Sequence, residues 1–172
     1  LTSSEVGCYL SHYRLIRQAH AQGLERICIL EDDVELEPAF ASVFAELLNL
    51  PDECEMIRLM ALKIRKRKVV KTFADGVHQL VRPERGLLGT QGYLINRRGM
   101  EKFLAHARRI FEAIDKVYDH FYEYDLRMYG VEPHIILEVA QPSSIIKSNR
   151  ARARVPLWVK VFYPIGKGLR SM

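Results

Sequence analysis

Three consecutive carboxylates, Glu31, Asp32 and Asp33, directly follow the apolar residues 27–30. A short continuous apolar run predicts a strand buried on both faces, with the acids at its carboxyl end, where ligands bind in open α/β sheets. Because side chains alternate along a strand, Glu31 and Asp33 are predicted to point one way and Asp32 the other. Each carboxylate disfavours the ionised form of its neighbour, and a divalent cation removes that repulsion. Mg²⁺ and Mn²⁺ prefer oxygen ligands and complete their shells with water and phosphate, so the triplet predicts a metal–diphosphate site.

The same triplet has a simpler interpretation as the lead-in to a helix. Pro38 suits the first turn of a helix, and the residues after it form an apolar helical face. Carboxylates ahead of a helix interact favourably with the positive end of its dipole. The triplet alone leaves both interpretations open, and the surrounding elements have to decide between them.

Helix and strand patterns alternate along the rest of the chain. Thr2 and Glu5 have capping-box spacing, and Gly23 is typical of a helix end, so the first helix is predicted to stop there. Strands are predicted over residues 27–30, 56–62, 69–73, 77–81, 93–95 and 134–139, and helices up to residue 22, over 38–48, from 96 to 108 and over 111–129. Strands that alternate with helices indicate an α/β architecture.

Length and composition fit one domain with a sizeable core, since the chain has 172 residues of which 48% are hydrophobic. No apolar run approaches the roughly 20 residues of a membrane-spanning helix. The three cysteines, Cys8, Cys28 and Cys54, show no metal-site spacing, and Cys28 is predicted to be buried. This pattern favours a reducing compartment, hence the cytoplasm. The net charge of +5 favours anionic partners, and the first residue, Leu1, predicts that a segment precedes it.

Several motifs resemble glycosyltransferase family 25, the lipopolysaccharide and lipooligosaccharide sugar transferases. The first two are LTSSEVGCYLSH at residues 1–12 and ICILEDDVEL at residues 27–36, which are specific as a pair. LLGTQGYLINRRGMEKFL, at residues 87–104, is similar to the family's segment of glycine, small residue and tyrosine before a helix. Residues 113–145 resemble its later part, where an aspartate precedes a proline and a Ser-Ile pair.

The resemblance implies a GT-A-like (Rossmann-like) α/β domain, with a mixed sheet flanked by helices, that transfers a sugar from a nucleotide donor with inversion. Residues 1–146 are expected to form the catalytic domain, and residues 147–172 a basic, aromatic tail. The family's additional βα portion does not precede the first motif, so the domain is expected to be truncated at its N-terminus.

The resemblance also assigns donor-binding roles. Glu31 and Asp33 would bind Mn²⁺ or Mg²⁺, which stabilises the charge on the leaving diphosphate, and Asp32 would orient them or contact the ribose. The donor would be a UDP-hexose, and galactose comes from the family only. Further residues expected to line the cleft are Glu5, Ser11, His12, Gly89, Thr90, Gln91 and Gly92. Simpler alternatives exist for Glu5 as a capping carboxylate, for His12 as a satisfied buried histidine, and for the glycine-rich loop as a tight turn.

An inverting transfer needs a general base, which contributes roughly 10²- to 10⁴-fold to the rate. Asp119 best matches the family's late aspartate. Asp115 competes for the role because it lies one helical turn earlier on the same face. Both could instead be solvated charges on a helix surface.

Basic residues gather in two places: Lys63, Arg65, Lys66, Arg67 and Lys68, and then Arg150, Arg152 and Arg154. Such runs are usually solvated faces. The functional alternative is contact with a glycolipid acceptor or an anionic membrane surface, worth roughly 1 kcal/mol per basic residue. That alternative predicts a cytoplasmic protein, peripheral on the inner face of the membrane.

Two other classes of function compete with the transferase. A nucleic-acid-binding domain would use the basic runs, but it leaves the acidic triplet unexplained and no recognition motif is present, so nucleic acid is not expected as a partner. An inactive or truncated transferase domain, kept for assembly with a partner, stays open.

Overall fold

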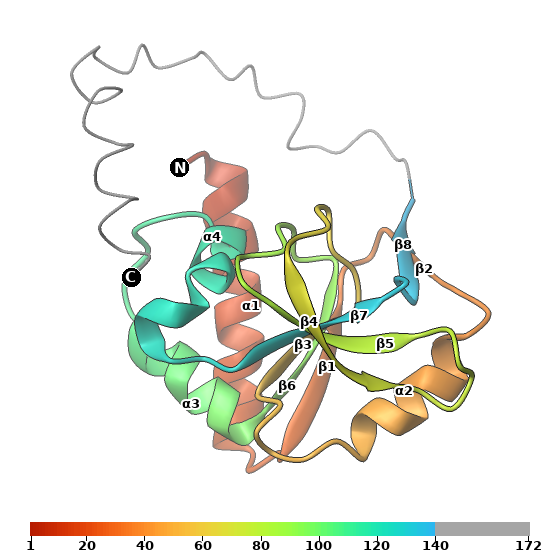
Figure 1. Cartoon of the computed structure of the whole chain (residues 1–172). Helices are drawn as coiled ribbons and strands as arrows, with labels where there is room; N and C mark the ends of the chain where they lie inside the picture. The colour runs from red at the N-terminus through yellow and green to blue at the C-terminus, as the bar shows by residue number, and fades with distance from the viewer. Residues whose placement is uncertain (140–172) are drawn as a thin grey trace. The chain divides into compact units, whose positions relative to one another are not determined.

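A six-stranded mixed sheet organises residues 1–139, the part of the chain that the computed structural model describes (Figure 1). The strand order is β1-β6-β3-β7-β5-β4. Their bounds are β1 (Arg26–Leu30), β3 (Met56–Arg58), β4 (Arg67–Thr72), β5 (Gln79–Pro83), β6 (Gly92–Asn96) and β7 (Met128–Glu132). Both β1 and β3 pair antiparallel with β6, and β7 pairs parallel with β3. The carboxyl ends of β1 and β3 therefore open onto the same edge of the sheet, and the predicted α/β class is confirmed.

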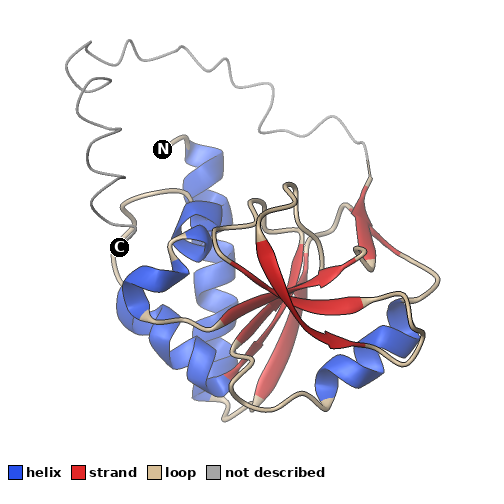
Figure 2. Cartoon of the chain, viewed as in Figure 1, coloured by secondary structure: helices blue, strands red, loops and turns tan. Residues whose placement is uncertain are grey.

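Helices cover both faces of this sheet (Figure 2). One layer contains α1 (Ser3–Ala21), α3 (Arg97–His106), α4 (Ile114–Asp119) and the 3₁₀ turn η1 (Phe121–Tyr124), and α2 (Phe40–Leu48) covers the other face. The central strand β6 is buried throughout because Tyr93 and Ile95 enter the core under α1 and α3, whereas Leu94 enters the core under α2. In the described part of the chain, no helix is long and apolar enough to cross a membrane.

Several local predictions are confirmed. The backbone N–H of Thr2 donates to Oε2 of Glu5 at 2.7 Å, and the Glu5 N–H donates to Oγ1 of Thr2 at 3.2 Å, which completes a capping box. Asn96 caps α3 by accepting from the Gly99 N–H at 2.9 Å. The β4–β5 hairpin forms around residues 73–78 as expected.

The prediction that residues 27–30 are buried on both faces is wrong. In the described sheet β1 is an edge strand, so it has a neighbouring strand on one side only. Ile29 is buried, but Cys28 and Leu30 are exposed, which also corrects the prediction of a buried Cys28. The apolar run therefore marks an edge strand with one partly open face.

The predicted helix over residues 111–129 is also wrong. The segment forms α4 and η1 and then re-enters the sheet as β7. Asp125 adopts a left-handed conformation, with φ of 52°, and the Leu126 N–H donates to the Phe121 carbonyl at 2.9 Å, so the helical turn closes there.

Two further strands differ from the prediction. The strand predicted over residues 56–62 is limited to β3, and the one predicted over 134–139 is limited to β8 (Ile136–Glu138). β8 pairs with β2 (Val34–Leu36), a strand that the sequence did not reveal, in a separate two-stranded ribbon. This ribbon begins directly after the acidic triplet and fixes its far end.

Candidate active site

Polar side chains converge where β1 and β3 end and β6 begins. α1 supplies Cys8 and His12, the end of β1 supplies Glu31, β3 supplies Arg58, and α4 supplies Tyr118. The loop before β6 closes the group from the other side. Parallel strands bring their carboxyl ends to one edge, so residues far apart in sequence meet here.

His12 is buried and joins two parts of this cluster. Its Nδ1 atom lies 2.9 Å from the Tyr93 hydroxyl, which in turn lies 2.7 Å from the Tyr118 hydroxyl. Its Nε2 atom lies 3.6 Å from Oε1 of Glu31. His12 is therefore a satisfied buried histidine, as the simpler alternative predicted, and it also contacts the first acid of the triplet.

Glu31 points into the cluster. The Thr90 hydroxyl donates to its Oε1 atom, and its backbone N–H donates to the Gln91 carbonyl at 2.9 Å. Burial on its own would raise the pKa of Glu31, but the nearby His12 ring and the hydrogen bond from Thr90 outweigh burial and lower the pKa below its ordinary value. Glu31 is therefore held as a carboxylate.

Cys8 adds a thiol to this carboxylate. The Cys8 sulfur, a His12 nitrogen and a Glu31 oxygen all lie within 4.8 Å of one another. Burial, together with the charge of Glu31, raises the pKa of the Cys8 thiol, and a hydrogen bond with Thr90 opposes the rise. Cys54 is buried elsewhere, in the core under α2, so Cys8 is the cysteine that contributes to this cluster among residues 1–139.

Asp32 and Asp33 have different surroundings from Glu31. They lie in a turn after β1, so residues 32 and 33 do not continue the strand. Asp32 is exposed. The Oδ1 atom of Asp33 is buried and has no hydrogen-bond partner in the described part of the chain.

Arg58 is a central residue that the sequence analysis missed. It is fully buried, its Nη2 atom donates to the carbonyls of Leu88 (3.3 Å) and Gly89, and its guanidinium lies 5.8 Å from the centre of the Tyr118 ring. Burial lowers the pKa of Arg58, and the charge of Asp119 opposes this effect. Its Nε and Nη1 atoms have no partner among residues 1–139. The available signal was a lone arginine within an otherwise apolar strand.

Asp119 ends α4 and is buried beside the glycine-rich loop. Its Oδ1 atom accepts from the Leu88 N–H at 3.1 Å. Burial raises its pKa, and the Leu88 hydrogen bond and the charge of Arg58 oppose the rise. A Cβ on Gly86 would lie 2.0 Å from Cγ of Asp119, so this close approach requires glycine.

Asp115 lies one turn earlier and is half-buried. It accepts from the backbone N–H of Lys116 at 2.9 Å, at the start of α4. Its charge acts on both Cys8 and Arg58. Both candidate bases therefore lie beside the cluster, and Asp119 is the more enclosed of the two.

The glycine-rich loop packs tightly against the acids. Gly89 has a φ of 76°, and a Cβ there would lie 2.2 Å from Oε1 of Gln91. The Nε2 atom of Gln91 donates to Glu138 at 3.2 Å, whereas its Oε1 atom is buried without a partner among residues 1–139. A Cβ on Gly92 would lie 2.4 Å from Cδ1 of Ile136. The loop therefore brings Thr90 onto Glu31 at close range.

Other predicted residues lie outside this cluster. Glu5 is engaged in the capping box. Ser11 is exposed, and its hydroxyl donates to the Gly7 carbonyl at 3.0 Å. In the basic run, Lys66 forms an ion pair with Glu84 at 3.0 Å, and Arg67 forms one with Glu132 at 2.6 Å. Arg65 donates to the Gly86 carbonyl at 3.1 Å. Lys63 and Lys68 are exposed. Arg150, Arg152 and Arg154 lie outside the described residues.

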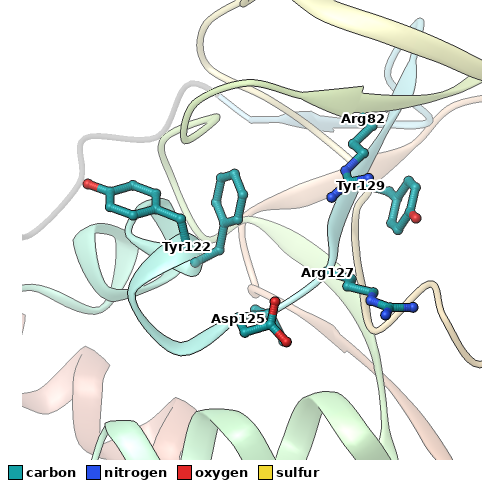
Figure 3. A pocket seen from close by; sticks show the side chains of 7 residues that line it. Arg82, Tyr122, Asp125, Arg127 and Tyr129 are labelled. Carbon is teal, nitrogen blue, oxygen red and sulfur yellow. The ribbon is translucent and has the colours of Figure 1, made fainter. Parts of the chain in front are cut away.

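A cavity of about 380 Å³ lies near the amino end of β7, whereas the polar cluster lies beyond the carboxyl end of the parallel strand β3. Figure 3 shows its lining, which includes Arg82, Tyr122, Asp125, Arg127 and Tyr129. None of the predicted site residues within residues 1–139 lines it. Because ligands in open α/β sheets bind at the carboxyl ends of strands, we place the candidate site at the polar cluster rather than in this cavity.

Comparison with known proteins decides the family. The model of "Glycosyltransferase family 25 (LPS biosynthesis protein)" matches residues 1–118. The chain belongs to glycosyltransferase family 25. Within this family 25 chain, the matched range holds the acidic triplet and Arg58, and it ends one residue before Asp119. The resemblance predicted from the motifs is confirmed.

Relatives of this family 25 chain include proteins named as galactosyltransferases and one named as inactive. Procollagen galactosyltransferase 1-B of Xenopus laevis is 31% identical over 153 residues, which cover 79% of this chain and 25% of the relative. Human procollagen galactosyltransferase 2 is 31% identical over 107 residues, or 60% of this chain and 17% of the relative. Human inactive glycosyltransferase 25 family member 3 is 43% identical over 49 residues, or 28% of this chain and 8% of the relative. The chain thus spans about a quarter of the length of the first of these relatives.

Proposed function

We propose that the chain carries the catalytic region of an inverting hexosyltransferase, which moves a hexose from a UDP-hexose to a glycan or glycolipid acceptor. Membership of family 25 supports sugar transfer. Galactose is supported by the names of the procollagen galactosyltransferases, and a lipopolysaccharide or lipooligosaccharide acceptor by the description of the family.

The observation that carries the donor site is the buried Oδ1 atom of Asp33, which lacks a partner among the described residues. Desolvating a carboxylate oxygen is costly unless a hydrogen bond or a cation compensates it. Mn²⁺ or Mg²⁺ fits that requirement, and when bound it would neutralise the charge of the diphosphate that leaves. The sequence predicts Glu31 and Asp33 as its ligands. Because Glu31 points into the cluster with His12 and Thr90, whereas Asp32 and Asp33 lie in the turn after β1, we propose Asp33 and Asp32 as the carboxylates that hold this ion.

Asp119 is our proposed general base. It takes the proton of the acceptor hydroxyl as that oxygen bonds to the anomeric carbon, and UDP leaves with the electrons of the broken bond. Burial raises the pKa of Asp119, which makes its carboxylate a stronger base. Asp115 is the competing base, since it lies beside the same cluster.

The exposed basic residues Lys63, Lys66 and Lys68 are proposed to face a phosphorylated glycolipid or an anionic membrane surface. The ion pair of Lys66 with Glu84 also fits a solvated face. A peripheral position on the inner face of the cytoplasmic membrane stays a prediction.

An inactive domain that serves in assembly is the second candidate function. It is favoured by the similarity to a relative named as inactive, which is 43% identical over 49 residues. An inactive domain would bind UDP weakly or not at all.

Calorimetric titration of the full chain with UDP, with and without Mn²⁺, distinguishes the two. The transferase predicts binding that requires Mn²⁺ and that is lost in Asp33→Asn. Asp52→Asn, at an exposed aspartate outside the cluster, is the matched control and should bind as the unaltered chain does. Absence of UDP binding in both metal conditions would favour the inactive domain.

A further inference from the structure

Cys8, His12 and Glu31 combine the three kinds of side chain that bind transition metals. Cys8 and His12 are four residues apart on α1, so they lie on one face of the helix, and Glu31 reaches them from the end of β1. Their ligand atoms lie within 4.8 Å of one another. We propose that these three residues form a binding site for a thiophilic divalent cation of the Zn²⁺ class, separate from the ion of the sugar donor.

The distances suit a small tetrahedral ion. Two ligands that each lie about 2.1 Å from a tetrahedral ion are separated by about 3.4 Å. The Nε2 atom of His12 and the Oε1 atom of Glu31 are 3.6 Å apart. The helix and the strand end therefore already hold these two ligands at nearly the required separation, and the sulfur of Cys8 is close enough to complete a three-residue set by side-chain rotation.

Each ligand also has a supporting contact of the kind that metal sites use. A bound cation would replace the proton between Nε2 of His12 and Oε1 of Glu31, and His12 would then donate from Nδ1 to the Tyr93 hydroxyl and present its Nε2 lone pair to the ion. Tyr93 can then donate to Tyr118, which fixes the ring of His12 through a buried relay. Thr90 fixes the carboxylate of Glu31 in the same way. Such contacts orient ligands and are characteristic of built metal centres.

The donor set determines which cation is preferred. A thiolate together with an imidazole favours Zn²⁺, whereas the carboxylate oxygens of Asp32 and Asp33 suit Mn²⁺ or Mg²⁺. Three protein ligands leave the fourth tetrahedral position to a water molecule. The bound ion would tie α1 to the end of β1 and hold Glu31, the residue from which the acidic turn starts. This site does not depend on the proposed transfer reaction.

Cobalt titration tests the site, because Co²⁺ takes the place of Zn²⁺ and reports its ligands in its absorption spectrum. The full chain should bind one equivalent of Co²⁺ with a thiolate-to-cobalt charge-transfer band, and Cys8→Ser should abolish the band. Cys28→Ser, at the exposed cysteine, and His20→Gln, on the same helix, are the matched controls and should retain it. A spectrum without the band, or a band that survives Cys8→Ser, would overturn the proposal.

A second measurement needs no substitution, and it shows whether Cys8 binds Zn²⁺ even if Cys8→Ser fails to fold. Zn²⁺ should slow the alkylation of Cys8, followed by peptide mass spectrometry, by about tenfold or more, while exposed Cys28 in the same sample reacts at an unchanged rate. Equal reactivity of Cys8 with and without Zn²⁺ would contradict the site. The UDP titration with Mn²⁺ is a separate readout, so a failure of the proposed transferase would leave this result intact.

Discussion

The Nε2 atom of His12 lies 3.6 Å from the Oε1 atom of Glu31, and this contact joins the first helix to the start of the acidic turn. The contact is enclosed, since the His12 side chain is only 6% exposed. Electrostatic interactions are stronger where water is excluded. The ionisation of Glu31 is therefore linked to the stability of the fold.

Glu31→Gln should reduce stability at neutral pH by about 1 kcal/mol, because it removes the charge that faces His12 and leaves Thr90 with a neutral acceptor in place of a charged one. The folded-state pKa of Glu31 lies below its ordinary value of 4.5, so its contribution is fully present above pH 4.5 and is lost as the pH falls through the lower folded pKa. The difference in melting temperature between the two proteins should shrink as the pH falls below 4.5. Glu35→Gln, at an exposed residue of β2, should show no such convergence.

Asp119→Asn should lower the turnover number by roughly 10²- to 10⁴-fold if Asp119 is the base. Its fold should survive, because the asparagine oxygen can still accept from Leu88. Since burial raises the pKa of Asp119, activity should fall on the acid side of a pKa above its ordinary 3.8, where the base becomes protonated. Release of UDP in the presence of an acceptor measures both effects. A larger loss in Asp115→Asn would transfer the role to Asp115.

Arg58→Met should destabilise the protein by about 3 kcal/mol, because it leaves Asp119 and the carbonyls around Leu88 without their buried cation. Adding Asp119→Asn should restore part of the loss, since an amide carries no charge that needs compensation. Urea unfolding of the two single variants and the double variant gives the coupling free energy between Arg58 and Asp119, which we expect to be about 1–3 kcal/mol. Additive effects would show that the two residues do not interact.

Gly86→Ala should destabilise the protein by about 1–3 kcal/mol, because the new Cβ would lie 2.0 Å from Cγ of Asp119. Gly7 is the matched control: it is exposed on α1, and a Cβ added there would meet nothing within 4 Å, so Gly7→Ala should stabilise by about 0.5–1 kcal/mol. Thermal melts followed by circular dichroism compare the two. Equal shifts would show that the packing at Gly86 is looser than we describe.

Local signals in the sequence predict the elements well where capping or turn chemistry is explicit. Thr2 with Glu5, Asn96 and the β4–β5 hairpin each specify structure through contacts a few residues apart. The helix predicted over residues 111–129 is wrong because the aromatic spacing there suits a helix, whereas the second half of the segment packs into the sheet as β7. Tertiary contacts there override local preference.

The candidate site was predictable only in part. The acidic triplet and the glycine-rich loop have readable patterns, and the structure brings Glu31 and Thr90 together. Tyr93 and Tyr118 gave no signal, because the Tyr93 hydroxyl meets His12 across 81 residues of sequence and meets the Tyr118 hydroxyl across 25 residues. Cys8 did give one, since its four-residue spacing from His12 matches one helical turn, although the cysteines considered by themselves showed no metal pattern.

The two outer strands of the sheet differ in how readily they accept another strand. β4 displays Arg67, Lys68 and Lys71, and such charges discourage edge-to-edge pairing. β1 instead offers unpaired backbone groups next to exposed Cys28 and Leu30, within the sheet that the structure describes. Concentrated solutions of this chain should consequently self-associate by strand addition at β1, and a lysine introduced there would keep the molecules apart.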